Sequence, residues 1–397
     1  MSEPVLARAI GRRDLPRPSE RPLSEVYDVA LLDLDGVVYL SRGAVPGAPE
    51  ALAEARHRGM RLAFVTNNAS RSPSAIAAQL TGLGVPATSA EVVTSAHAAA
   101  HLIADRLPPG APVLVVGGIG LRIALRERGL RPVSTAADRP AAVVQGYGPD
   151  VGYPQLAEAG LAVRAGAWYV AANVDATLPT ARGIQPGNGS LVQVIVTATG
   201  QKPVVAGKPE PPLHSEAVAR TGARRPLVVG DRLDTDIEGA VRVGADSMLV
   251  LTGVTRPADA VLAPRQRRPT YLAYNLVGLL EPHPAVIPAP APEGSFRCGG
   301  WTARLVPDGR LSPAGRPGAG HMSGSAGPAD ADGRADADDR RDFATQPDSD
   351  AQPGRLEITG TGTPIDGLRA LCAAAWSAGP VTADSVRSAV AALPFPD

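Results

Sequence analysis

Short apolar runs that lead straight into polar residues limit the folds open to this chain. The first run, Val29 to Leu32, is followed at once by Asp33-Leu34-Asp35-Gly36. Such a run with turn residues behind it predicts a buried strand, and open α/β sheets place their chemistry at the carboxyl ends of strands. Two carboxylates there could act as nucleophile and proton carrier beside a divalent cation. An ordinary Asp-Gly turn explains this one segment equally well.

Three later apolar runs end in the same way. They bring a hydroxyl and amides suited to phosphoryl oxygens, a lysine at a rigid turn, and three carboxylates within six residues. Such acidic density beside an apolar strand is costly without a cation. Together the four segments therefore predict one phosphate and metal site. The three further segments are Thr66-Asn67-Asn68 after 62–65, Gly207-Lys208-Pro209-Glu210 after 204–206, and Gly230-Asp231-Arg232-Leu233-Asp234-Thr235-Asp236 after 227–229.

In this order the four segments resemble the motifs of the haloacid dehalogenase superfamily: an Asp-x-Asp pair, a Thr or Ser, a Lys and a terminal acidic cluster. More narrowly, they are similar to the branch that contains the NagD-type, 4-nitrophenyl phosphate and phosphoglycolate phosphatases. The resemblance covers about residues 25 to 280, and the segments 172–179 and 183–190 add to it. It implies an α/β phosphoric monoester hydrolase: a doubly wound parallel-sheet (Rossmann-like) core, an inserted α/β cap domain and a C-terminal extension.

The resemblance also implies a role for each motif residue. Asp33 would attack phosphorus and form an aspartyl-phosphate, and Asp35 would protonate the leaving alkoxide and then take a proton from water. Thr66 and Asn67 would hold phosphoryl oxygens. Lys208 would neutralise the charge of the phosphate and pair with Asp33.

A metal site follows from the same resemblance. Its implied ligands are Asp33, the backbone carbonyl of Asp35 and the carboxylate of Asp231. Asp236 would orient the water shell of the metal or Lys208, and Asp234 has no firm role. The expected cation is Mg²⁺, because this hard ion prefers an all-oxygen, water-rich site completed by substrate phosphate.

Composition restricts the partners. The 39 basic side chains equal the 39 acidic ones, so charge gives no case for nucleic acid. Cys298 and Cys372 form no ligand-spaced pair, which favours a reduced, cytoplasmic protein. No apolar run approaches the roughly 20 residues needed to span a bilayer, so membrane insertion is not expected. His97 and His101 lack the glutamate of a metalloprotease motif and are interpreted as ordinary helix residues.

The order of apolar runs and turns predicts several regions. We expect a flexible N-terminal tail, a core interrupted by a cap that is too long for a loop, a linker too poor in apolar residues to order itself, and a short helical C-terminal segment. A helix from Ser190 to Thr199 is expected to return the chain to the core. The predicted bounds are 1–24 for the tail, 25–87 and 186–280 for the core, 88–185 for the cap, 281–355 for the linker and 356–397 for the last segment.

Substrate choice should reside in the cap, because the motif strands contact only the phosphoryl group. Asn173 and Asp175 are the specificity candidates, although an Asn-x-Asp turn that caps the loop is an equal alternative. The branch acts on small phosphorylated metabolites, including phosphoglycolate, glycerol phosphate, nucleotides such as UMP and pyridoxal phosphate. The abundance of Ala, Gly, Arg and Pro resembles actinobacterial proteins, whose homologues resemble glycerol 3-phosphate phosphatases of glycerophospholipid metabolism.

Other functions stay open at this point. A phosphomutase would pass the phosphoryl group to another alcohol, and a non-catalytic phosphate-binding regulator would use the C-terminal segment to engage a partner. Gly117-Gly118-Ile119-Gly120 lacks the complete dinucleotide-binding pattern and is interpreted as a cap turn. The oligomeric state also stays open between a monomer and a homodimer, although caps of this kind often form dimer interfaces in the family.

Overall fold

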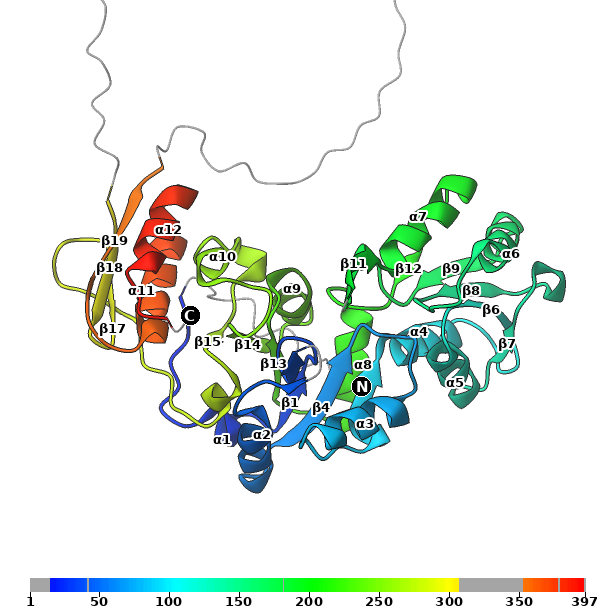
Figure 1. The fold of residues 1–397 in the computed structure, drawn as a ribbon, viewed down its shortest axis with the longest axis horizontal. Helices are drawn as coiled ribbons and strands as arrows, with labels where there is room; N and C mark the ends of the chain where they lie inside the picture. Colours follow the sequence, from blue (N-terminus) through cyan, green and yellow to red (C-terminus); the bar gives the residue numbers. More distant parts are fainter. Residues whose placement is uncertain (1–14, 41–42, 181, 307–352, 378, 396–397) are drawn as a thin grey trace, which may run out of the picture.

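The computed structural model describes residues 15–40, 43–180, 182–306, 353–377 and 379–395. Three units follow one another across the molecule (Figure 1). They are a central α/β core, a smaller α/β cap built on the sheet β6 to β12 (residues 112–205), and a C-terminal module of residues 287–306 and 353–395.

The core is a six-stranded sheet in which every neighbouring pair is parallel. Helices cover both of its faces, α2 (Ala48–His57) and α3 (Pro73–Gly82) on one, and α4 (Ser95–Ala104) and α8 (Pro211–Thr221) on the other. The predicted doubly wound core is therefore confirmed. In spatial order the strands are β15 (Tyr271–Ala273), β14 (Asp246–Val250), β13 (Pro226–Gly230), β1 (Val29–Leu32), β4 (Arg61–Thr66) and β5 (Val92–Thr94).

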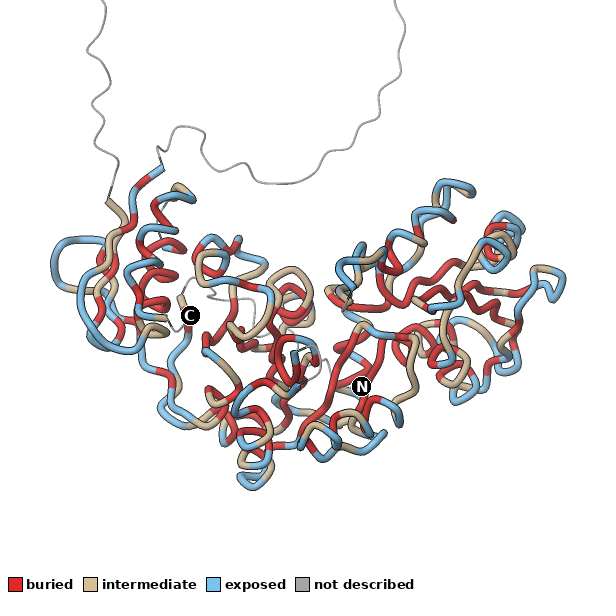
Figure 2. The backbone as a smooth tube through the Cα atoms, in the orientation of Figure 1, coloured by how far each residue is buried: buried red, intermediate tan, exposed pale blue. Residues whose placement is uncertain are grey.

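The strands are buried over nearly their whole length (Figure 2). A sheet covered on both faces selects continuous apolar strands, which is why the runs at 29–32 and 227–229 show no polar alternation. β1 lies between β4 and β13, and three of the four polar motifs lie at the ends of these strands. The topology therefore gathers distant motifs at one edge of the sheet.

The cap is a second parallel sheet with its own helices. These are α5 (Ile119–Glu127), α6 (Tyr153–Arg164) and α7 (Asn188–Thr199), and the hairpin β10 (Thr177–Thr180) with β11 (Gly183–Pro186) precedes α7. Helix α4 connects core and cap, and one apolar cluster continues from the core sheet through α4 into the cap. The cap strands are, in order, β12 (Val204–Val205), β9 (Trp168–Ala171), β8 (Ala142–Gln145), β6 (Pro112–Val116) and β7 (Arg131–Val133).

The predicted return to the core at residue 186 was wrong. Helix α7, expected in the core, packs on α6 and buries Val192 and Ile195 among the residues of the cap sheet. Strand β12, which precedes Lys208, pairs with β9 and so completes the cap sheet. β5, placed in the predicted cap, joins the core sheet. Strand pairing is a long-range contact, and apolar periodicity does not say which sheet a strand joins.

The N-terminal prediction also needs correction. Residues 1–14 lie outside the described residues, but 15–24 pack on the core. Leu23, in the short helix α1 (Leu23–Val26), is fully buried, and Arg17 donates its backbone N–H to Thr270 O at 2.9 Å and pairs with Asp246 at 2.8 Å. The many arginines and prolines suggested a loose tail because their tertiary partners are not visible in the sequence.

The predicted linker begins too early, and the last segment is not only helical. An antiparallel sheet, β16 (Ile287–Pro288), β17 (Ser295–Cys298), β18 (Trp301–Val306) and β19 (Arg355–Gly360), joins residues from both predicted regions. Helices α11 (Pro364–Ser377) and α12 (Ala383–Ala391) complete the module. Its apolar cluster includes Leu249, Val261 and Leu272 of the core region, so the module packs on the core. The linker residues 307–352 lie outside the described residues.

Candidate active site

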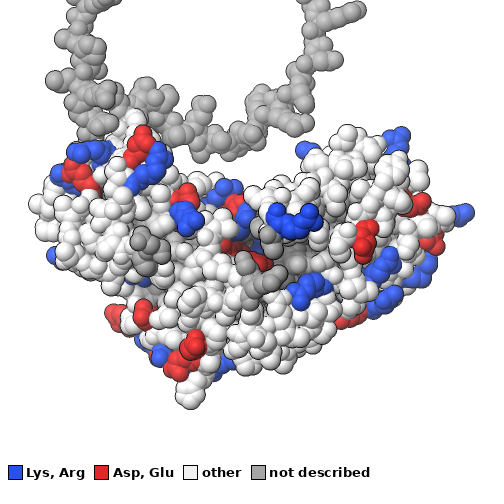
Figure 3. All heavy atoms as spheres, in the orientation of Figure 1, with Lys and Arg blue, Asp and Glu red and all other residues white. Residues whose placement is uncertain are grey.

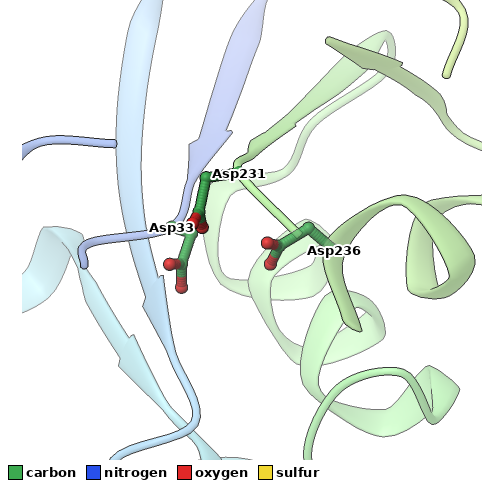
Figure 4. A group of neighbouring side chains, drawn as sticks. All are labelled: Asp33, Asp231 and Asp236. Carbon is green, nitrogen blue, oxygen red and sulfur yellow. The ribbon is translucent and has the colours of Figure 1, made fainter. Parts of the chain in front are cut away.

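Three carboxylates converge at the carboxyl ends of β1 and β13 (Figure 4). Asp33 follows β1, Asp231 follows β13, and Asp236 lies in the short helical turn Leu233–Ile237. One oxygen from each lies within 4.8 Å of the other two. The structure thus brings together the first and last motifs, which lie about 200 residues apart in the sequence.

Lys208 lies among these carboxylates. Its ammonium donates to Asp33 Oδ1, to Asp236 Oδ1 at 2.8 Å and to the backbone carbonyl of Val65 at 3.2 Å. The lysine side chain is 4% exposed, so the charge is held by the protein rather than by water. This is the Asp33–Lys208 pair that the sequence predicted.

Burial and charge crowding shift the pKa values of these groups. Burial raises the pKa of Asp33 well above its usual value, with a further rise from Asp236 and Asp231 that Lys208 opposes. Burial and the charge of Asp236 raise the pKa of Asp231 to about 7. Burial lowers the pKa of Lys208, but Asp236 and Asp33 raise it by more. Three carboxylates thus face one ammonium, and this crowding favours either proton uptake or a bound cation at this edge of the sheet.

The residues fit a hard divalent cation. Asp231 is 1% exposed, and its Oδ1 has no hydrogen-bond partner among the described residues, whereas Oδ2 accepts the Val254 N–H at 2.7 Å. An orphaned carboxylate oxygen beside a second carboxylate, Asp33, suits an oxygen-preferring ion such as Mg²⁺. Asp236 uses both of its oxygens, on Lys208 and on the Arg232 N–H at 3.1 Å, so it fits the predicted orienting role better than that of a ligand.

Glycines make room for this cluster. A Cβ on Gly230 would lie 2.1 Å from Asp236 Cβ, and one on Gly253 would lie 2.0 Å from Asp231 Oδ2. Gly36 has a φ of +84°, and a Cβ there would lie 2.5 Å from Asp231 Oδ2. The loop of Gly253 and Val254 thus supports Asp231, a role that the sequence analysis missed; its signal was Thr-Gly-Val-Thr directly after the apolar run of β14.

Thr66 is the last residue of β4 and Asn67 follows it at the same edge; Thr66 is 5% exposed. The side-chain amide of Asn67 lies 3.3 Å from both Asp175 oxygens and 3.2 Å from Lys208 O, and its carbonyl oxygen accepts the Lys208 N–H at 2.8 Å. Asn67 therefore ties the lysine loop to the cap. Phosphate binding by Thr66 and by Asn67 stays a prediction.

The two specificity candidates differ. Asn173 is 5% exposed, donates to Asn67 O at 2.7 Å and accepts the Asp175 N–H at 3.3 Å. This is the loop-capping turn left as an alternative, so Asn173 holds the loop. Asp175 is half-buried, and burial raises its pKa while its Asn67 bond and the charges of Lys208 and Arg232 oppose that rise. Only Asp175 of the pair remains placed to meet a substrate.

Asp35 lies exposed at the opening of the site, and the Tyr39 hydroxyl donates to its Oδ2 at 3.4 Å. Removal of water by the surrounding protein raises the pKa of Asp35. Asp234 forms a bidentate pair with Arg232 at 2.9 and 3.0 Å, away from the carboxylate cluster.

In Figure 3, acidic atoms line the hollow between the core and the cap, with basic side chains on its flanks. A buried lysine and this acidic hollow suit a phosphate ester that arrives with a cation.

A doubly wound core with an inserted cap and an Asp, Lys and Asp cluster at the carboxyl ends of its strands defines a phosphotransferring hydrolase. The family comparison agrees. Residues 30–131 match the haloacid dehalogenase-like hydrolase family, and residues 205–279 match a second family of this hydrolase type. The chain belongs to the haloacid dehalogenase-like hydrolases, which confirms the predicted resemblance. Residues 348–393 also match the GCN5-related N-acetyltransferase-like domain, which the sequence analysis missed.

Individual relatives narrow the comparison. The chain is 50% identical over 289 residues to the D-glycerol 3-phosphate phosphatase of Mycobacterium tuberculosis, covering 73% of this chain and 81% of that protein. It is 39% identical to a 5'-nucleotidase of Bacillus subtilis over 58% of this chain and 90% of that enzyme. These relatives are phosphatases, in agreement with the predicted enzyme class.

Solved structures give the same result. The crystal structure of the M. tuberculosis glycerol phosphate phosphatase in complex with magnesium superposes with a TM-score of 0.73 and 40% identity, covering 94% of this chain and 99% of that one. A double mutant of a thermostable NPPase from Geobacillus stearothermophilus superposes with a TM-score of 0.57 and 36% identity. The match covers 63% of this chain and 96% of that one. The M. tuberculosis relative was solved with magnesium, the cation that the sequence predicts for this chain. None of the described helices has the length and apolarity to cross a bilayer.

Proposed function

We propose that this protein is a Mg²⁺-dependent phosphatase that hydrolyses D-glycerol 3-phosphate through an aspartyl-phosphate on Asp33. The observation that carries the proposal is the contact of Lys208 with both Asp33 and Asp236 beside the orphaned oxygen of Asp231. The proposed substrate is that of the D-glycerol 3-phosphate phosphatase of M. tuberculosis, to which the chain is 50% identical over 289 residues.

The proposed reaction has two steps. A carboxylate oxygen of Asp33 attacks phosphorus, and the bond from phosphorus to the glycerol oxygen breaks as Asp35 gives that oxygen a proton. Water then attacks the phosphorus of the aspartyl-phosphate while Asp35 takes a proton from that water; the bond from phosphorus to the Asp33 oxygen breaks, which releases inorganic phosphate, frees the Asp33 carboxylate and reprotonates Asp35. A raised pKa suits Asp35 to hold the proton before the first step.

The remaining site residues stabilise charge. Lys208 is held ready to neutralise phosphoryl oxygens, and the Thr66 hydroxyl and the turn behind it would donate to others. Asp33, Asp231 and the Asp35 carbonyl would hold Mg²⁺, which would supply Lewis-acid stabilisation of the phosphoryl charge. Asp175 is the proposed contact to a glycerol hydroxyl, because it brings a half-buried carboxylate from the cap to the core site.

A nucleotide phosphatase is the second candidate, because the chain is also 39% identical to a 5'-nucleotidase. Phosphoglycolate and pyridoxal phosphate are further members of the same substrate class. We place the reaction in glycerophospholipid metabolism and the protein in the cytoplasm, as a homodimer; these three statements rest on the sequence interpretation.

Phosphate release across a substrate panel tests the proposal. The panel holds both glycerol 3-phosphate enantiomers, phosphoglycolate, pyridoxal phosphate, UMP and 4-nitrophenyl phosphate, each with and without Mg²⁺. We expect a Mg²⁺-dependent preference for D-glycerol 3-phosphate that Asp33→Asn abolishes and that Glu293→Gln, an exposed surface variant, retains. A preference for UMP would move the assignment to nucleotides, and undiminished turnover in Asp33→Asn would refute the nucleophile.

A further inference from the structure

A cavity of about 370 Å³ lies where the C-terminal module meets the core, apart from the carboxylate cluster. One wall is the segment 273–284, which follows β15, and the other is the first turns of α11. The volume lies in the range of small-molecule sites. Its polar lining includes Tyr274, Asn275, Glu281, His283, Asp366 and Arg369, and most of the remaining lining is apolar.

Buried polar groups fix the walls of this cavity. Arg369, 6% exposed, donates to Asp366 Oδ1 at 2.5 Å and to the backbone carbonyl of Leu272 at 2.6 Å. A nitrogen of the same guanidinium lies 3.1 Å from Nδ1 of His283, whose Nε2 lies 2.9 Å from Gly278 O. Burial and the Arg369 charge lower the pKa of His283 to about 4, so this ring is neutral and accepts from Arg369.

The lining of this cavity carries a net negative charge, which comes from one carboxylate. Arg369 and Asp366 neutralise each other, and His283 carries no charge at pH 7. Glu281 adds a carboxylate that has no ion pair among the residues the structure describes. Tyr274 adds an aromatic side chain that is 43% exposed. A carboxylate and an exposed aromatic ring beside apolar walls are the groups that recognise organic cations.

We propose that this cavity binds a small organic ammonium compound and that its occupancy is coupled to the phosphatase site. The charged head would lie against Glu281 and the ring of Tyr274, and the body would contact the apolar wall that includes Val277 and Ile365. The binding itself does not rest on the proposed function; its effect on turnover does.

A short chain of contacts connects the cavity to the metal site. The backbone carbonyl of Tyr274 accepts the Leu251 N–H at 3.0 Å. Next along the chain, the Thr252 hydroxyl donates to Gly36 O at 2.6 Å, and the Val254 N–H donates to Asp231 Oδ2 at 2.7 Å. The segment 251–254 therefore contacts both the cavity wall and a predicted metal ligand, and a shift of Tyr274 is transmitted to Asp231.

The comparisons show in which relatives such a cavity can form. The G. stearothermophilus NPPase aligns over 96% of its own length yet covers only 63% of this chain. The M. tuberculosis enzyme covers 94% of this chain. α11 supplies one wall, so a core without the module has no such cavity, and control through it would be a property of the longer proteins.

Calorimetric titration of the full chain with choline tests the binding. The matched probe is 3,3-dimethyl-1-butanol, which has the same shape without the charge. We expect saturable binding of choline alone, weakened about two- to fivefold in Glu281→Gln, as loss of an exposed charge partner predicts. Glu293→Gln, an exposed glutamate outside the lining, is the control. Absence of binding, equal binding of the alcohol, or unchanged binding in Glu281→Gln would each overturn the site.

The coupling is tested by the Mg²⁺ concentration that gives half-maximal phosphate release, measured with and without saturating choline. We expect a shift of twofold or more in wild type that disappears in Glu281→Gln. Binding with an unchanged Mg²⁺ response would overturn the coupling alone. Failure of the proposed function is separate, because it would appear as no turnover even when the calorimetric binding is intact.

Discussion

Gly253→Ala tests whether the loop after β14 holds the metal site in place. A Cβ at residue 253 would lie 2.0 Å from Asp231 Oδ2 and 2.5 Å from its Cγ. Ordinary contact begins at 3.4 Å, so the carboxylate or the loop must move by about 1.4 Å, the difference between these two distances. That movement breaks the 2.7 Å bond from the Val254 N–H to Asp231.

The functional cost follows from this displacement. Loss of an outer hydrogen bond to a metal ligand typically weakens metal affinity about 10- to 100-fold. We therefore expect the half-maximal Mg²⁺ concentration for phosphate release to rise by about that factor. The backbone at Gly253 does not have a positive φ, so the effect is steric.

The measurement is a Mg²⁺ titration of initial rates, with thermal unfolding in EDTA as a check of folding. Gly82→Ala is the matched control, because no heavy atom lies within 4 Å of a Cβ at that position in α3. A Mg²⁺ response in Gly253→Ala within twofold of wild type would show that the loop does not position Asp231.

Four further perturbations follow from the structure. Lys208→Met should lower kcat about 10²- to 10³-fold, since it removes the charge that contacts Asp33 and Asp236; steady-state kinetics with a retained circular dichroism spectrum measures this. Glu216→Gln should destabilise the protein by about 2 kcal/mol and raise KM, because this buried carboxylate in α8 accepts from Arg128 of the cap at 2.7 Å. Urea unfolding measures the change, with Glu210→Gln as the control, since Glu210 forms an exposed pair with Arg242. Equal stability of the two variants would contradict the prediction. The His283 pKa of about 4 lies below the unfolded value of 6.5, so the unfolded chain binds more protons between these pH values. The free energy of unfolding should therefore fall by about 3 kcal/mol as pH drops from 6.5 to 4. Denaturant titration at several pH values measures this, and the free energy of unfolding should depend less steeply on pH in His283→Gln. Leu368→Ala, at a fully buried position in α11, should cost about 2 to 5 kcal/mol; a calorimetric transition of the core that does not change would show that the module unfolds independently.

The candidate site was largely predictable from local sequence. Asp33 and Asp231 follow the neighbouring parallel strands β1 and β13, which deliver their carboxyl ends to one edge of the core sheet. Lys208 follows β12 of the cap sheet, so motif order predicted its membership of the site but sheet geometry did not. Asn173 shows where prediction from local sequence fails, because it was a candidate for substrate contact and instead supports the loop. Its side chain is a polar group on the right loop, but its contacts with Asn67 and Asp175, which make it a support, depend on a residue more than 100 positions away.

The sequence by itself determined the strand and helix pattern of the core, the motif residues and the hydrolase family, because each depends on neighbours within a few residues or on motif order. Only the tertiary structure decided that β12 and α7 belong to the cap, that residues 15–24 pack on the core, and that β18 pairs with the distant β19. These are long-range pairings whose free energy comes from burial between segments, and the sequence of one segment does not specify the surface that covers it.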